Sequence, residues 1–259
     1  MAFLLSVVRP LVYLSIPVFL LRTAANASPT GRYYVRFGLY VFSITFTAVC
    51  AAFVAAGMTL IGRTYDVNNL VAGSFYVFGK WMLGIRIEVE GEEYLQTRPA
   101  VFMGNHQSML DVLVLGRCAS VKSLAAFHTN FAPLTLFSPR RLIPKGSSIM
   151  AKKELRWTPL GPFMILSGTV FVDRGNSASA MRSIQIAGEE MRIRRTSLWL
   201  YPEGTRTSQE EPNMITFKKG GFHLAIQAGI PIVPVVTENY WRLYHPGVFE
   251  SGVIKVRGA

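Results

Sequence analysis

The chain has 259 residues, half of them apolar, and its mean hydropathy is positive. This length allows one sizeable core with an appendage, and the apolar excess indicates contact with a membrane. The net charge of +12 suits an anionic partner, such as nucleic acid, an acidic lipid surface or a phosphorylated substrate, whereas two cysteines, Cys50 and Cys118, exclude a disulfide framework and a zinc-binding cysteine spacing.

Two apolar segments lie at the N-terminus. Residues 37–61 are uncharged and continuous, and a helix needs roughly 20 such residues to cross the hydrocarbon core of a bilayer. Residues 2–21 are apolar but interrupted by one arginine and two prolines, so they predict a retained, kinked membrane helix, with a cleaved signal peptide as the alternative. We therefore expect membrane-embedded helices over residues 1–62. The arginines around these segments give no clear orientation.

From residue 63 the pattern changes to that of an α/β domain, which we expect to fill residues 63–259. Alternation of strands and helices predicts an α/β fold with a mixed, largely parallel sheet flanked by helices, and chemistry is expected in the loops at strand ends. Strands are predicted at 85–89, 100–103, 169–172, 198–200 and 232–236, and helices from Asn176 or Ser177 to about Arg195 and over 222–228, closed by Gly229.

The stretch GNHQSMLD, residues 104–111, follows the predicted strand at 100–103 directly. His106 and Asp111 would not share a face of a regular helix, so they form a pair only if His106 lies in a loop and Asp111 in the first helical turn. There the carboxylate could accept a hydrogen bond from one ring nitrogen and leave the other free as a base. A structural histidine is the alternative, and from spacing alone it is favoured.

Three further strand ends carry charged residues. In Glu203-Gly204-Thr205-Arg206, the glycine allows a positive φ or a close backbone approach, the arginine matches a phosphate or carboxylate, and the glutamate could hold the arginine or the loop. An ordinary turn with a solvated arginine is the alternative. The pair Asp173-Arg174 lies at a predicted strand end, where it could contribute to the site, but in isolation a surface ion pair is the favoured interpretation. Lys152, in a basic stretch, could bind phosphate or an anionic membrane, or simply lie on a solvated face.

The order of these blocks resembles that of the glycerolipid acyltransferase family, which includes the 1-acylglycerol-3-phosphate acyltransferases, and the N-terminal segments resemble those of fungal-type members. Each block alone is weak, but four in the expected order over roughly residues 84–256 are specific. The blocks are Asn105-His106-Gln107-Ser108 through Asp111, Gly168–Arg174, Tyr201-Pro202-Glu203-Gly204-Thr205-Arg206, and Ile230-Pro231-Ile232-Val233-Pro234.

The resemblance implies that His106 is the general base on the free hydroxyl of a lysophospholipid, oriented by Asp111, and that the acyl donor is acyl-CoA, attacked directly. It implies no metal and no cofactor beyond this co-substrate. A hydroxyl attacking a thioester needs a proton acceptor that works near neutrality, and a dianionic phosphate needs Arg and Lys donors, so the residue chemistry agrees. The residues implied in acceptor binding are Glu203, Gly204, Thr205 and Arg206, with help from Lys152 and Arg174.

The chain departs from the family pattern in two places. Asp111 and Lys152 are farther apart than is usual, which predicts an insertion within about 119–150, either a surface loop or a retained intron. The chain also stops after residues 254–259, where family members continue, so we expect an incomplete sheet edge. Both features put the activity of this chain in question.

The leading hypothesis is an integral membrane acyltransferase that makes phosphatidate from lysophosphatidate and acyl-CoA. The alternatives are transfer to glycerol 3-phosphate or another lysophospholipid, and an inactive membrane-bound lipid-binding protein. Binding of nucleic acid fits the charge but not the membrane segments. Because acyl-CoA is made and used on the cytosolic side, we expect the catalytic domain to face the cytosol at the endoplasmic reticulum, in contact with membrane lipid.

Overall fold

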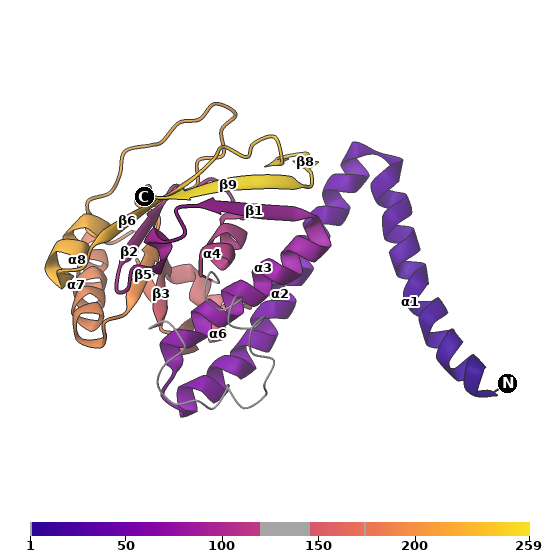
Figure 1. Ribbon diagram of the computed structural model, residues 1–259, viewed down its shortest axis with the longest axis horizontal. Helices are drawn as coiled ribbons and strands as arrows, with labels where there is room; N and C mark the ends of the chain where they lie inside the picture. The colour runs from indigo at the N-terminus through magenta and orange to yellow at the C-terminus, as the bar shows by residue number, and fades with distance from the viewer. Residues whose placement is uncertain (1, 120–145, 174) are drawn as a thin grey trace.

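The computed structural model describes residues 2–119, 146–173 and 175–259. It begins with two helices, α1 (Ala2–Ala27) and α2 (Pro29–Leu60), and α1 extends away from the rest of the molecule (Figure 1). The turn between them is built by Ser28, whose side chain accepts a hydrogen bond from the backbone N–H of Gly31 at 2.9 Å and so caps α2, while Pro29 starts the helix. Despite its prolines, α1 runs as one uninterrupted helix.

Helix α2 coincides with the membrane segment predicted at 37–61. Among the helices in the described residues, it is the one long and apolar enough to cross a membrane, by length and composition. One side of α2 is docked on the domain, where Ala51 and Ala55 are buried next to Phe163, while Phe53 on another side is 77% exposed. Membrane contact of α1 stays a prediction.

The domain is built on a seven-stranded sheet with the order β1-β9-β6-β2-β5-β3-β4. The five neighbouring strands β6, β2, β5, β3 and β4 are parallel, and β9 runs antiparallel to β6 and parallel to β1, so the predicted mixed, largely parallel sheet is confirmed. The strands are β1 (Ile85–Glu90), β2 (Val101–Gly104), β3 (Ser147–Lys152), β4 (Val170–Val172), β5 (Ser197–Leu200), β6 (Ile232–Thr237) and β9 (Gly252–Gly258).

Helices cover both faces of the sheet. On one face, α3 (Val67–Leu83) and α4 (Asp111–Ala119) pack over a core that includes Phe102, and α2 packs behind α3. On the other face, α7 (Ser177–Arg194) and α8 (Gly220–Ala228) pack over a core that includes Val101 and Met103. Successive residues of β2 therefore point to opposite faces, as the strand period requires.

Most of the predicted elements are present, and the corrections concern the chain end. The strands at 85–89, 100–103, 169–172, 198–200 and 232–236 and the helices after Asn176 and before Gly229 lie within a residue or two of the predicted bounds. The expected incomplete sheet edge at the last strand is wrong, because β9 lies inside the sheet and pairs with β1 on one side and β6 on the other. The predicted insertion falls mostly outside the described residues, and its described ends belong to α4 and β3.

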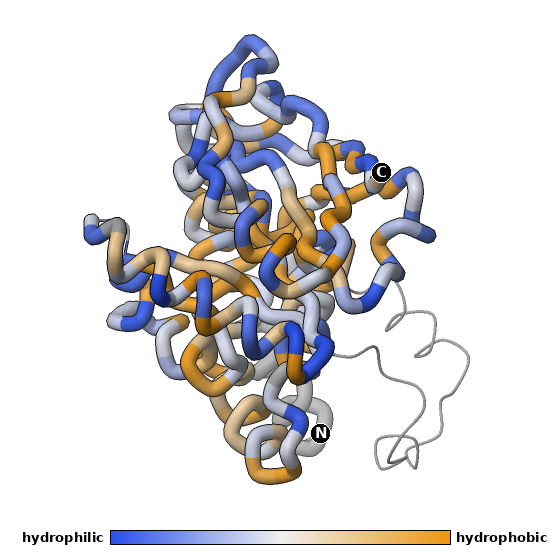
Figure 2. Tube along the Cα trace, turned by 90° about the vertical axis from the view of Figure 1, so that its left-hand side faces the viewer, coloured by the Kyte–Doolittle hydropathy of each residue, from blue (hydrophilic) through white to orange (hydrophobic). Residues whose placement is uncertain are grey.

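The remaining elements are short. The loop from residue 206 to 219, between β5 and α8, lies at the top of Figures 1 and 2, where Figure 2 colours it as mainly hydrophilic. The short elements are α6 (Gly161–Leu166), the 3-10 turns Thr64–Asp66, Tyr94–Gln96 and Lys153–Trp157, and a hairpin of β7 (Tyr244–His245) and β8 (Val248–Phe249).

Candidate active site

Four polar segments meet at one edge of the sheet. Because β2, β5, β3 and β4 are parallel neighbours, the loops after them leave from the same edge. These loops begin with Asn105-His106 after β2, Tyr201 to Arg206 after β5, Lys153 after β3 and Asp173 after β4. The structure thus brings the predicted blocks together on the side where ligands bind in open α/β sheets.

The predicted contact between His106 and Asp111 is present. His106 lies in the loop after β2, and Asp111 is the first residue of α4. Nδ1 of His106 is 2.7 Å from Oδ2 of Asp111, and the two side chains are 16% and 3% exposed. The imidazole therefore stands at the surface of the site, with its carboxylate partner beneath it.

The surroundings of Asp111 fix its orientation and the tautomer of His106. Oδ2 also accepts the backbone N–H groups of Gln107 at 2.7 Å and Ser108 at 3.1 Å, and Oδ1 accepts the hydroxyl of Tyr240 at 2.6 Å. Both oxygens of Asp111 therefore act as acceptors. A carboxylate can only accept, so Nδ1 of His106 carries its proton and Nε2 has the free lone pair of a base.

A chain of hydrogen bonds with one direction leads into Asp111. The hydroxyl proton of Tyr240 is used on Asp111, so the contact of 2.9 Å between the oxygens of Ser108 and Tyr240 has Ser108 as donor. The Ser108 hydroxyl in turn accepts the N–H of Leu110 at 3.1 Å. Burial, followed by the negative charge of Asp111, raises the pKa of Tyr240 well above its usual value, so Tyr240 stays protonated and remains a donor.

Tyr240→Phe is expected to reduce activity about tenfold, because Oδ1 of Asp111 loses a buried hydrogen-bond donor and the carboxylate is held less firmly beside His106. Initial rates of acyl transfer with equal amounts of protein would show the loss. Tyr244→Phe is the matched control, because the Tyr244 hydroxyl is directed at the sulfur of Met109 and not at Asp111. Equal rates in both variants would contradict the role of Tyr240.

Glu203 is directed inward and holds the loop after β2. It is 1% exposed, its Oε1 accepts the backbone N–H of His106 at 2.7 Å, and its Oε2 accepts the hydroxyl of Thr207 at 2.9 Å. The backbone N–H of Thr207 donates to the carbonyl of His106 at 2.9 Å. Of the two roles considered for Glu203, the structure supports holding the loop, and its contact with the acceptor stays a prediction.

The ring of Tyr201 lies flat against the imidazole. The two ring centroids are 4.1 Å apart with an angle of 14° between the planes. The hydroxyl of Tyr201 is directed at the carbonyl of Asp111 at 3.4 Å, and burial is the main cause that raises its pKa well above the usual value. Tyr201 thus fixes the plane of His106, whereas Asp111 fixes its rotation and tautomer.

The residues after Glu203 place positive charge on the solvent-exposed side of the site. Gly204 has φ +69°, as the glycine predicted, and an added Cβ would lie 2.9 Å from the side chain of Lys218. Thr205 and Arg206 are exposed. No residue in the described ranges makes an ion pair or hydrogen bond with Arg206, so its guanidinium is open to a ligand. Lys218 joins it from the loop before α8.

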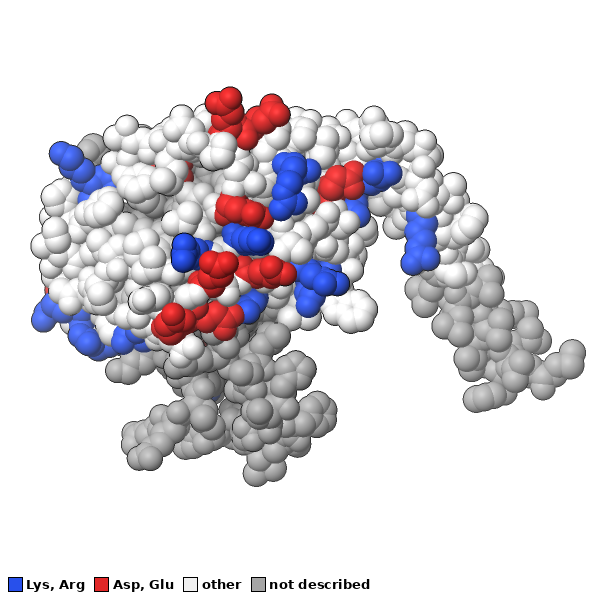
Figure 3. Space-filling model, turned by 45° about the horizontal axis from the view of Figure 1, so that its top comes forward, with Lys and Arg blue, Asp and Glu red and all other residues white. Residues whose placement is uncertain are grey.

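The other predicted acceptor-binding residues lie farther along the same edge. Lys152 ends β3 with its ammonium 3.5 Å from Glu154, and Asp173 after β4 pairs with Lys153 at 3.4 Å. Arg174 lies outside the described residues. The face shown in Figure 3 carries Lys and Arg interspersed with Asp and Glu, so the net positive charge is not gathered there into one basic field.

The geometry agrees with the comparison to known proteins. A model of the family described as Acyltransferase matches residues 86–238, which is more than half of the chain. The chain belongs to the acyltransferase family. It is 37% identical over 235 residues to the 1-acyl-sn-glycerol-3-phosphate acyltransferase of Saccharomyces cerevisiae, covering 89% of this chain and 70% of the yeast protein. It is 32% identical to the human 1-acyl-sn-glycerol-3-phosphate acyltransferase beta, covering 94% and 79%.

A solved structure shares the fold of this acyltransferase. The 1-acyl-sn-glycerophosphate acyltransferase of Thermotoga maritima superimposes with a TM-score of 0.56 at 19% sequence identity, covering 88% of this chain and 86% of the bacterial chain. At this identity the likeness shows the fold, which is that expected from the sequence.

Two groups at the site were not predicted. Tyr240 follows Asp111 by 129 residues, and the motif TENYWRLY carries no local signal for a contact with α4. Tyr40 of α2 donates its hydroxyl to the carbonyl of Met109 at 2.6 Å, inside the turn that joins His106 to Asp111.

Proposed function

We propose that this acyltransferase transfers an acyl chain from acyl-CoA to the sn-2 hydroxyl of 1-acylglycerol 3-phosphate and so forms phosphatidate. The observation that carries the proposal is the single orientation of His106, in which Asp111 holds Nδ1–H and leaves Nε2 free. The names of the yeast and human relatives support the choice of acceptor. Acyl-CoA is the donor that such a base-assisted transfer uses.

The chemistry follows from this geometry. Nε2 of His106 takes the proton of the sn-2 hydroxyl while the oxygen attacks the carbonyl carbon of the thioester. The C–S bond then breaks, the acyl group stays on the glycerol oxygen, and CoA leaves as a thiolate that takes the proton back from His106. Asp111 stabilises the imidazolium that exists between these steps. No acyl-enzyme is required.

Positive side chains on the solvent-exposed side of the site would bind the acceptor phosphate. Arg206 has the planar donor pattern that fits a phosphate in bidentate fashion. Lys218 lies in the loop before α8, and Lys152 ends β3 farther along the same sheet edge. Arg174 is proposed for the same role from the sequence resemblance alone. Thr205 and the backbone at Gly204 complete the acceptor-binding loop, which Glu203 anchors to His106.

The same proposal places the protein in the membrane of the endoplasmic reticulum, with the domain on the cytosolic side. The apolar helix α2 supports membrane association. The cytosolic side is inferred from the supply of acyl-CoA. The lipid partners are then lysophosphatidate as acceptor and the surrounding bilayer, without nucleic acid.

The test is acyl transfer from labelled oleoyl-CoA in membranes that carry the full chain. Lysophosphatidate is expected to be the preferred acceptor. Lysophosphatidylcholine lacks a free phosphate monoester, and glycerol 3-phosphate lacks the acyl chain. Membranes without the chain provide the blank. Preferred labelling of another acceptor would overturn the acceptor assignment, and no transfer to any of the three would overturn the enzymatic proposal.

A further inference from the structure

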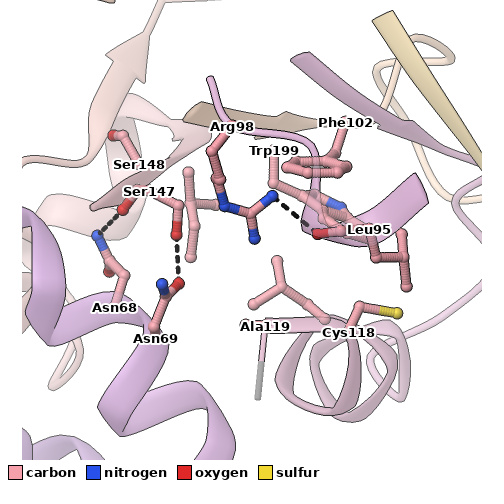
Figure 4. Close-up of a pocket in the computed structure, with 12 residues that line it drawn as sticks. Asn68, Asn69, Leu95, Arg98, Phe102, Cys118, Ala119, Ser147, Ser148 and Trp199 are labelled. Carbon is pink, nitrogen blue, oxygen red and sulfur yellow. Dashed lines mark hydrogen bonds between the residues drawn. The ribbon is translucent and has the colours of Figure 1, made fainter. Parts of the chain in front are cut away.

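A cavity lies away from the active site, on the face of the sheet covered by α3 and α4. It is bounded by the start of β2, the start of β3, the N-terminal turn of α3 and the C-terminal end of α4 (Figure 4). The cavity volume is about 20 Å³. This is enough for a water molecule or a small ion but not for a nucleotide or a whole lipid headgroup. Strand β2 separates it from His106, since Arg98 precedes the strand and His106 follows it.

Polar groups without partners line this cavity. Among the described residues that line this cavity, four have a buried side-chain atom that lacks a hydrogen bond: Nε of Arg98, Nδ2 of Asn69, Oδ1 of Asn68 and Nε1 of Trp199. Asn68 and Asn69 are each 2% exposed. An unpaired buried polar atom is costly, so four in the lining of one space indicate that a polar ligand belongs in it.

The two carbonyls beside Asn68 fix the orientation of its amide, and Asn69 contacts a hydroxyl. Nδ2 of Asn68 donates to the carbonyls of Ser147 at 2.9 Å and Ser167 at 2.8 Å, which leaves Oδ1 as the free acceptor. Oδ1 of Asn69 accepts the hydroxyl of Ser147, which leaves Nδ2 as a free donor. Figure 4 shows these side chains and Arg98 arranged around the same space.

Arg98 is a partly buried cation whose Nε is fully buried, and it has no carboxylate partner. All 15 Asp and Glu residues lie within the described ranges, and none of them forms an ion pair with Arg98. Nη1 donates to the carbonyls of Leu95 at 2.9 Å and Thr97 at 2.8 Å, and the guanidinium carbon lies 4.6 Å from the centre of the Phe102 ring. Burial lowers the pKa of Arg98 to about 10. A buried charge is costly unless an opposite charge compensates it.

We propose that this cavity binds a small tetrahedral oxyanion, of the type of hydrogen phosphate, with Arg98 and Asn69 as donors and Asn68 as acceptor. The ligand balances the charge of Arg98, its oxygens accept from Nε of Arg98 and Nδ2 of Asn69, and its remaining hydroxyl donates to Oδ1 of Asn68. A carboxylate such as acetate lacks that hydroxyl, and chloride lacks both the hydroxyl and directional acceptors. The site is separate from Arg206 and the acceptor phosphate.

The experiment measures the thermal unfolding midpoint of the full chain in detergent, in phosphate, acetate or chloride at equal ionic strength and pH 7. Phosphate is expected to raise the midpoint by about 2–4 °C over chloride, and acetate by less. Arg206→Ala should keep this rise, which separates the cavity from phosphate binding at the active site.

Asn69→Asp is the decisive variant, because it puts a carboxylate beside Arg98 and keeps an acceptor for Ser147. Its midpoint should no longer respond to phosphate. Asn176→Asp is matched in charge and residue type, and Asp caps a helix as well as Asn, so it should keep the rise. Arg98→Gln is a second variant, which removes the cation instead, and it should also lose the response.

The outcomes separate cleanly. A phosphate response present in the wild type, Arg206→Ala and Asn176→Asp but lost in Asn69→Asp or Arg98→Gln supports the site. An equal response in all variants places the anion elsewhere and overturns the proposal. An equal rise in acetate overturns the tetrahedral oxyanion, and no rise in the wild type means that water fills the cavity.

Discussion

His106→Ala is expected to lower kcat/KM for acyl transfer to lysophosphatidate by about 10²–10⁴-fold, the contribution that a positioned base makes. Nε2 is the ring nitrogen left free by the contact with Asp111, so its removal leaves the sn-2 hydroxyl without a proton acceptor. The side chain is small and partly exposed, and the backbone of His106 keeps its bonds to Glu203 and Thr207, so the loop should stay in place. The measurement is the initial rate with labelled oleoyl-CoA in membranes with equal amounts of protein.

His223→Ala is the matched control for this loss. His223 lies on α8 with its side chain exposed, so its replacement should change the rate by less than about twofold. KM for acyl-CoA should change little in His106→Ala, because the imidazole acts on the proton of the acceptor. Activity within tenfold of the wild type in His106→Ala would rule out His106 as the base.

Asp111→Asn is expected to cost about 10²–10³-fold in kcat, through loss of charge more than through a wrong tautomer. Oδ2 of Asp111 faces two backbone N–H groups, from Gln107 and Ser108, so the amide oxygen of asparagine must take that place. Its NH₂ group then faces Tyr240, and Nδ1 of His106 still has an acceptor. What disappears is the negative charge that stabilises the imidazolium during the reaction.

A second aspartate provides the control for this account. Asp66 also precedes a helix but pairs with Arg63 away from the site, so Asp66→Asn should leave the rate nearly unchanged. The measurement is kcat for acyl transfer in both variants. A kcat for Asp111→Asn within tenfold of the wild type would contradict the charge argument.

Local sequence patterns were sufficient for the elements that carry the site. Strand β2 reads as a short apolar run, and the spacing of His106 and Asp111 makes sense only across a loop and a helix start, which is where the structure has them. Gly204 was expected to allow a positive φ or a close backbone approach, and the structure has it at φ +69°. Each of these inferences depends on residues within a few positions of one another.

Long-range contacts were beyond such patterns. The inward orientation of Glu203, the stacking of Tyr201 on His106 and the hydrogen bond from Tyr240 to Asp111 all join segments about 90 to 130 residues apart, with distances that only the packed sheet defines. The place of β9 inside the sheet was missed for the same reason: a strand at the end of the sequence need not lie at the edge of the sheet.

The hydrogen bond from Tyr40 to the carbonyl of Met109 sets the depth at which the base works. At about 1.5 Å per residue, Tyr40 lies roughly 16 Å along α2 from Pro29, near the start of the uncharged segment 37–61. When α2 is in a bilayer, His106 is therefore tied to the flank of the hydrocarbon layer and not suspended in the aqueous phase above it. An acceptor can then keep its acyl chain among the lipids while its hydroxyl reaches Nε2 of His106. Only the headgroup and glycerol of the substrate then need to leave the hydrocarbon layer for the reaction.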